Sequence, residues 1–164
     1  MAEKIKMWLV GNTGLRNPNR IQEGFKAYAN SPYVGKIRGE ENEIGFMNFL
    51  NDQGIIKNEP GKDVSGSHAR KWRLMFSKNG FIYPKIYKKQ GKQDDLGKLD
   101  DITPFGKTFL KADTYPAIQE CYLRALSVEQ VEMPDKKSYY SPLRWILAIM
   151  LEIEKKTGSS EITR

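Results

Sequence analysis

Apolar residues recur at helical intervals along most of this chain. Ile21, Phe25 and Tyr28 follow one another at spacings of four and three, directly after the helix-start signal Asn17-Pro18. The same kind of pattern, with caps and stop signals at its ends, predicts further helices over residues 40–53, 67–79, 104–111, 116–127 and 141–158. The chain is therefore predicted to be mostly helical.

One stretch has the composition of strands instead. Residues 81–87 are rich in β-branched and aromatic side chains, residues 88–95 form a polar turn, and residues 96–102 can return as a second strand. Three helices, a hairpin and more helices predict an α+β, mostly α fold. We expect residues 1–112 to form a winged helix-turn-helix unit that has the β-hairpin as its wing. Residues 113–164 are expected to form a helical extension.

The helical pattern also predicts which side chains face inward. On the helix over residues 67–79, the side chains on one face are Ala69, Trp72, Met75 and Phe76. On the helix over residues 40–53 we expect Ile44, Met47 or Phe49, and Leu50 inside, while Glu40, Glu41 and Glu43 favour the helix dipole. Residues 143–153 are apolar almost all round, which predicts burial on more than one side.

Positive charge is concentrated in one part of the sequence. Between Lys62 and Lys92 there are nine Lys or Arg residues and one acid, Asp63, although the whole chain has a net charge of only +7. A helix and hairpin that carry so much positive charge are typical of proteins that bind a phosphate backbone. The basic half of the chain is therefore expected to face a polyanion.

Several classes of protein are disfavoured by what the sequence contains. A lone cysteine, Cys121, which we expect in the core, rules out a disulfide framework or a cysteine-based zinc site within this chain. The single histidine, His68, leaves a histidine-paired metal site or a Ser-His pair without support. No apolar run is long enough to span a bilayer, and the first residues lack a signal-peptide core. We expect a cytoplasmic protein.

The helix over residues 67–79 is the main candidate for reading DNA. Placed in the major groove, it would let Arg70 or Arg73 make paired hydrogen bonds to a guanine edge. Its other candidate contacts are Ser65, Ser67, His68, Lys71, Ser77 and Lys78, whereas Trp72 is expected in the core. The alternative is a solvated amphipathic helix whose charges only aid solubility.

Three further groups are candidates for contacts to DNA. A loop and helix start carry Asn12, Thr13, Arg16, Asn17 and Arg20, which could grip phosphates or form an ordinary N-cap with surface arginines. The hairpin carries Lys85, Lys88, Lys89 and Lys92, which fit backbone contacts or a charged edge strand that resists aggregation. Lys36 and Arg38 resemble phosphate contacts from a loop.

Three phrases together resemble the amino-terminal part of the AlwI-like type IIS restriction and nicking endonucleases. They are Trp8 with the later Leu15-Arg-Asn-Pro-Asn-Arg-Ile21, then Ala69-Arg70 with Asn79-Gly-Phe-Ile-Tyr83, and finally Ile102-Thr-Pro-Phe-Gly-Lys107. The resemblance implies DNA recognition by amino-terminal winged-helix subdomains. It also implies hydrolysis by a separate carboxy-terminal domain that binds Mg²⁺.

The chain departs from the family in its acidic residues. Pro134-Asp135 has the first part of a nuclease motif, and Glu152 and Glu154 lie near lysines, but these positions fall on a loop and on a helix rather than on neighbouring strands. We therefore expect no catalysis and no cofactor in this chain, with Mg²⁺ needed only by an absent nuclease domain.

The expected partners are double-stranded DNA with a short asymmetric site and the remainder of a parent nuclease, with the chain itself a monomer and not bound to a membrane. Two alternatives stay open. One is a stand-alone winged-helix transcription regulator that dimerises through residues 143–153. The other is a compact Mg²⁺-dependent nuclease.

Overall fold

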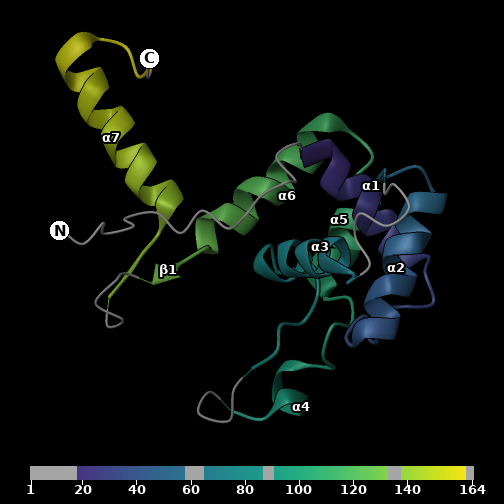
Figure 1. Ribbon diagram of the computed structural model, residues 1–164. Coiled ribbons are helices and arrows are strands. Elements are labelled where there is room, and N and C mark those ends of the chain that lie inside the picture. The colour runs from purple at the N-terminus through teal and green to yellow at the C-terminus, as the bar shows by residue number, and fades with distance from the viewer. Residues whose placement is uncertain (1–17, 58–64, 87–90, 133–137, 162–164) are drawn as a thin grey trace, which may run out of the picture. The chain divides into compact units, whose positions relative to one another are not determined.

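The computed structural model describes residues 18–57, 65–86, 91–132 and 138–161, and it is mostly helical, as predicted. Its elements are α1 (Pro18–Ala29), α2 (Glu40–Asp52), α3 (Ser67–Lys78), α4 (Gln93–Leu96), α5 (Pro104–Lys111), α6 (Tyr115–Val128), β1 (Val131–Glu132), β2 (Tyr139–Tyr140) and α7 (Pro142–Thr157) (Figure 1). Contacts divide the chain into two units, residues 12–122 and residues 123–164 with 1–11, which we take separately. The division falls inside α6.

The predicted helices are confirmed with small shifts at their ends. The helix predicted over residues 104–111 coincides with α5. Its start follows from local chemistry, because the Thr103 hydroxyl accepts a hydrogen bond from the Gly106 N–H at 2.9 Å and Pro104 occupies the first turn. The cap therefore sets the start of α5 as the sequence indicates, whereas among the described residues α2, α3, α4 and α7 begin without a side-chain cap hydrogen bond.

The core of the first unit is built from aromatic side chains of α1, α3, α5 and the segment after α3. Phe25 on α1 lies with its ring centroid 5.0 Å from that of Phe76 on α3 and 5.8 Å from that of Phe109 on α5. Phe81 stacks on Phe109 at 4.2 Å. Trp72 is buried as predicted, and it lies so close to α1 that any side chain at Gly24 would collide with its ring.

The inward face of α2 differs in detail from the prediction. Met47 and Leu50 are buried as expected, but Ile44 is only half-buried, and Phe46, which the prediction left out, is buried. Residues 53–66 separate α2 from α3, whereas a helix-turn-helix usually has a turn of about three or four residues. The helix-turn-helix part of the predicted fold is therefore not confirmed.

Among the described residues, the predicted hairpin pairs only at its base. The Thr103 N–H donates to the Phe81 carbonyl at 3.0 Å, the Tyr83 N–H to the Asp101 carbonyl at 2.9 Å, and the Asp100 N–H to the Tyr83 carbonyl at 3.0 Å. Beyond these bonds, residues 93–96 form the helical turn α4, so a second strand that starts at Leu96 is wrong. We call residues 81–103 the hairpin segment.

Gln93 explains the helical turn. Its side-chain amide donates to the carbonyls of Pro84 and Gly97, and its carbonyl oxygen accepts from the Ile86 N–H at 3.1 Å. These bonds join the two arms of the hairpin segment through one side chain instead of through a backbone ladder. Composition alone predicts strands here because it does not show this side-chain substitute.

The second unit consists, in its described part, of residues 123–132 and 138–161. The strands β1 and β2 pair antiparallel, with Val131 opposite Tyr140. No residue of α7 is buried, and Trp145, Leu147 and Leu151 are each about half exposed. The expectation that this apolar helix is buried on more than one side is therefore wrong for the described residues. None of the described helices has the length and apolar character needed to cross a membrane.

Candidate nucleic-acid interface

The outer face of α3 carries exposed basic side chains. The inner face consists of the buried side chains of Ala69, Trp72 and Phe76. On the opposite side lie Ser67, Lys71, Leu74 and Lys78, at intervals that keep them on one line of the helix surface. We call these four residues the outer stripe. Lys71 and Lys78 are exposed and form no ion pair with any residue that the structure describes.

The start of α3 is held against the first turn of α2. Gly66 precedes the helix with a φ of 69°, a left-handed conformation that glycine adopts without steric cost. A Cβ at Gly66 would lie 2.8 Å from the Cβ of Glu43 and 2.9 Å from its backbone carbon. The close approach fixes where the helix points, because no larger residue fits between Gly66 and α2.

Glu43 binds the two arginines that the sequence favours as base readers. Its Oε2 accepts from Arg70 Nη1 at 2.7 Å, and its Oε1 lies 3.7 Å from Arg73 Nη2. Glu43 is only 7% exposed, so a carboxylate there requires positive partners. Its role in the α2 dipole was expected from the sequence, but its contact with the two arginines was not.

Arg70 keeps part of its hydrogen-bonding capacity. Nη1 also donates to the Ser65 carbonyl at 2.6 Å, and Nη2 donates to the Ser65 hydroxyl at 3.4 Å. Among the described residues, its Nε–H and one Nη2–H make no bond, and the residue as a whole is exposed. Arg70 is therefore oriented by protein groups while one edge of its guanidinium stays open.

Arg73 is more enclosed than Arg70. Burial lowers the pKa of its guanidinium, and the nearby positive charge of Arg38 lowers it further, while Asp100 and Glu43 act in the opposite direction. The side chain stays charged at neutral pH because arginine loses its proton only in strong base. Contact between Arg73 and a base remains a prediction, and its position favours a role in joining α3 to α2.

Arg38 contacts the base of the hairpin segment. Its Nε donates to Asp100 Oδ2 and its Nη2 donates to Asp100 Oδ1, at 2.9 Å for the second bond. Asp100 is 1% exposed, and its φ of 59° is unusual for a residue other than glycine. The buried Tyr28 hydroxyl donates to the Asp100 carbonyl and accepts from the Gly35 N–H. Arg38 thus connects the residues after α1 to the hairpin segment, and a phosphate contact remains a prediction.

Lys98, which was not among the predicted contacts, lies near the loop that carries the candidate Lys36. Its Cε and Nζ lie 3.8 and 3.9 Å from the position that a Cβ would take at Gly35, next to the exposed Lys36. Lys98 is far from Gly35 in the sequence, and only the folded hairpin segment brings it near the loop that also carries Lys36. No local sequence signal could have found this approach.

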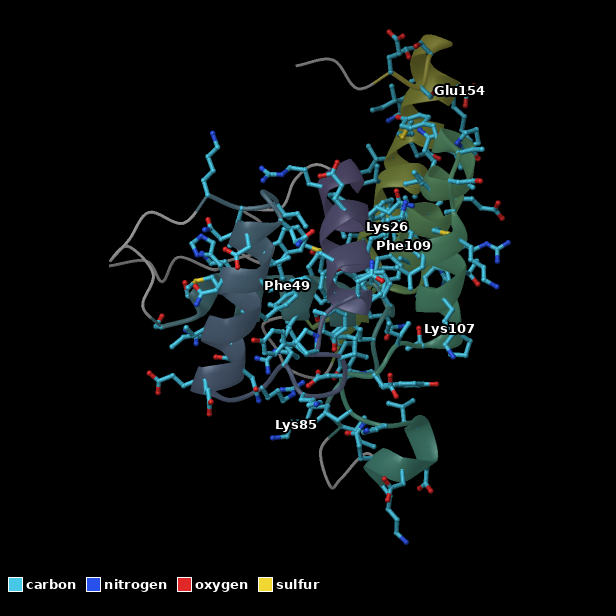
Figure 2. All side chains as sticks on the ribbon, turned by 90° about the vertical axis from the view of Figure 1, so that its right-hand side faces the viewer. Lys26, Phe49, Lys85, Lys107, Phe109 and Glu154 are labelled. Atoms are coloured by element: carbon cyan, nitrogen blue, oxygen red, sulfur yellow. The ribbon has the colours of Figure 1, made fainter. Side chains whose placement is uncertain are left out.

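The remaining candidates lie in several places. Arg20, on α1, donates to the Ile55 carbonyl. Ser67, His68 and Ser77 are partly exposed on α3, and Lys85 is exposed on the hairpin segment, where Figure 2 labels it. Figure 2 also shows Lys26 and Lys107 on other elements, so positive charge is not confined to α3. Six predicted positions lie outside the described residues, namely Asn12, Thr13, Arg16, Asn17, Lys88 and Lys89.

The acidic residues show no arrangement for a metal ion in the part of the chain that the structure covers. Among residues 18–57, 65–86, 91–132 and 138–161, no group of three or more His, Cys, Asp or Glu could hold one. Glu152 pairs with Lys155 at 2.8 Å on α7, the helix that also carries Glu154. Asp135 lies outside the described residues.

A helical unit that carries a basic helix on its surface is typical of proteins that bind a polyanion. The particular family follows from comparison with known proteins: residues 77–164, more than half of the chain, match the family model of the AlwI restriction endonuclease, and the chain belongs to this family. No curated protein and no solved structure gives a match. Family membership indicates a function related to restriction endonucleases.

Proposed function

We propose that this chain is the sequence-specific DNA-recognition part of a type IIS restriction or nicking endonuclease. The observation that carries the proposal is the outer stripe of α3, where Lys71 and Lys78 project from a helix whose other side is fixed in the core. In the proposed complex α3 enters the major groove of double-stranded DNA, and the hairpin segment lies along the phosphate backbone as the wing of a winged helix.

Shape and length support α3 as the reading helix. An α-helix with its side chains is about 10–12 Å across, close to the roughly 12 Å width of the major groove. The 12 residues of α3 give it enough length to follow several base pairs, and its basic side chains would neutralise phosphates at the groove edges. The diameter and the length of α3 therefore both fit the major groove without any change in the aromatic core.

The two arginines fit different roles within this proposal. Arg70 presents the open edge of its guanidinium while Glu43 and Ser65 hold the other edge. A side chain held in this way loses little conformational freedom when it binds a base, which favours specificity. Arg73 fixes α3 to α2, and it supports the reading helix from behind.

Hydrolysis is proposed to lie outside this chain. Members of the family that the sequence resembles carry a Mg²⁺-binding carboxylate-Lys motif in a separate carboxy-terminal domain, and Glu154 lies on a helix instead. Purified chain incubated with plasmid DNA and Mg²⁺ should leave the DNA supercoiled. Cutting that disappears in Glu154→Gln or Asp135→Asn would support the compact-nuclease alternative.

The exposed apolar side chains of α7 favour one second candidate, a dimeric winged-helix transcription regulator. Trp145, Leu147 and Leu151 could cover their counterparts on a second copy. Light scattering separates the two functions. A monomer on DNA with an asymmetric site supports the nuclease module, and a dimer on a palindrome supports the regulator.

Selection from random duplexes tests the proposed function directly. The purified chain should enrich one short asymmetric sequence from double-stranded DNA, and it should retain that preference over a single-stranded competitor. Failure to enrich any sequence, or a preference for single strands, would contradict sequence-specific recognition of duplex DNA.

A further inference from the structure

Leu74 is an apolar side chain in the middle of a basic surface. It is 52% exposed and belongs to the outer stripe, with Lys71 three residues before it and Lys78 four residues after it. It is not part of the hydrophobic core cluster of the first unit. The reason for a leucine at this position therefore has to be found outside the core.

Exposure by itself explains nothing, because single leucines on protein surfaces are common. The neighbours of Leu74 are more informative. The side chains three and four residues away from it on α3 are each cationic or carry a hydroxyl group: Arg70, Lys71, Ser77 and Lys78. An apolar protein partner that covered Leu74 would have to desolvate the two lysine ammonium groups without pairing them, which is costly.

Duplex DNA satisfies both kinds of side chain at once. Phosphates pair with Lys71 and Lys78 at the edges of the major groove, and the floor of the groove offers one apolar feature, the C5-methyl group of thymine. The polar groups on the base edges there, N7, O6, O4, N6 and N4, are hydrogen-bond acceptors or donors, which a leucine leaves unpaired. The charges around Leu74 therefore favour DNA as the partner, and its apolar side chain favours thymine as the base that it contacts.

We infer that Leu74 is a specificity-determining residue that contacts the C5-methyl group of a thymine in the recognised site. This inference rests on the proposed function, since it requires α3 in the major groove of duplex DNA. It goes further by naming a base that the site must contain, opposite the middle of α3. It also assigns the reading of that base to a side chain that forms no hydrogen bond.

The test removes the methyl group from the DNA and the apolar side chain from the protein. In the duplex selected by the wild-type chain, each thymine is replaced in turn by deoxyuridine, which lacks only the C5-methyl group. At one position this change should weaken wild-type binding about four-fold, the loss expected for one buried methyl group. At that position Leu74→Ala should bind the thymine and deoxyuridine duplexes equally.

A matched control and a folding control complete the experiment. Leu123→Ala removes another exposed leucine, on α6, which is not part of the proposed interface, and should keep the full four-fold preference of the wild type. Thermal unfolding of Leu74→Ala should match that of the wild type because the side chain is not in the core cluster. A preference for thymine that persists unchanged in Leu74→Ala would overturn the inference.

The outcomes separate this inference from the proposed function. If the wild-type chain selects a duplex but no deoxyuridine replacement weakens binding, or if the selected site lacks thymine, Leu74 has no such role and the proposed function stands. If the wild-type chain selects no duplex at all, both fail together.

Discussion

At the scale of single residues, Glu43 is a nearly buried acid next to the basic residues of α3. Its carboxylate is nearly buried and has Arg70 and Arg73 as partners. A buried charge is tolerated only when partners compensate it, and the partners in turn rely on the charge. The orientation of α3 relative to α2 should therefore depend on this one acid.

Glu43→Gln tests that dependence while it preserves side-chain shape. The free energy of unfolding in urea at pH 7 should fall by about 1–3 kcal/mol, less than for a fully buried ion pair because Arg70 is partly exposed. Glu41→Gln, on the exposed side of the same helical turn, should change it by no more than about 0.5 kcal/mol. Equal effects of the two changes would show that Glu43 has no special role.

Tyr28 provides a test at high pH. Burial raises the pKa of its hydroxyl well above the ordinary tyrosine value. The unfolded chain loses this proton above about pH 10 while the folded chain keeps it, so the stability that Tyr28 contributes is complete below pH 10 and falls as the pH rises further. Tyr28→Phe lacks the ionisable group and cannot show this loss.

The expected result is a stability gap that narrows with pH. At pH 8, Tyr28→Phe should be about 1–3 kcal/mol less stable than the wild type, because the Asp100 carbonyl and the Gly35 N–H lose their partner. Between pH 10 and 11 the gap should shrink by up to about 1.4 kcal/mol. Urea titrations at these pH values measure it, and a gap that stays constant or widens would argue against a protonated Tyr28.

A change at Arg70 should affect binding to the selected duplex more than binding to random duplex DNA. Arg70→Ala should lose roughly 1–3 kcal/mol of binding free energy for the selected duplex and much less for random duplex DNA, because a paired contact to a guanine edge is sequence-dependent. Fluorescence anisotropy with both duplexes measures the two losses. An equal loss on both would reassign Arg70 to the phosphate backbone.

At the scale of elements, the hairpin segment is the proposed wing, and Lys85 is its exposed lysine within the described residues before the turn. Lys85→Ala should weaken binding to selected and random duplexes alike. Each phosphate contact removed should flatten the plot of log affinity against log salt by about one unit of slope. A slope that does not change would place Lys85 away from the DNA.

Some of these helices and strands could be predicted from the sequence and others could not. The start of α5 and the inner face of α3 were predicted well because a cap and apolar spacing act locally, at Thr103 and at Trp72 and Phe76. The hairpin segment was predicted poorly because Gln93 replaces backbone pairing with side-chain bonds that composition does not encode. The apolar helix α7 was expected to be buried, but the described residues leave it exposed.

The candidate interface was predicted in part for the same reason. The helical period alone placed Lys78 on the face of α3 opposite the buried one. The contacts of Glu43 with Arg70, of Arg38 with Asp100 and of Lys98 with Gly35 join distant parts of the chain. Such pairs depend on tertiary structure, so the sequence could not show that three of its selected arginines have acidic partners.

At the scale of the whole molecule, the family match and the basic helix α3 both fit a protein related to restriction endonucleases. The family model matches residues 77–164, and the basic helix α3 lies mostly before that match, in the first unit. We therefore propose that the first unit recognises DNA and that the outer stripe of α3 contacts the duplex.

The most direct test of that claim compares two double variants that remove equal charge from exposed lysines. Lys71→Ala with Lys78→Ala changes the outer stripe, and Lys26→Ala with Lys111→Ala changes the last turns of α1 and α5. Affinity for the selected duplex, measured by anisotropy at fixed salt, should fall at least ten-fold, or about 1.4 kcal/mol, for the first variant and change little for the second. Equal losses for the two variants, or no loss for the first, would contradict the claim that α3 faces the DNA.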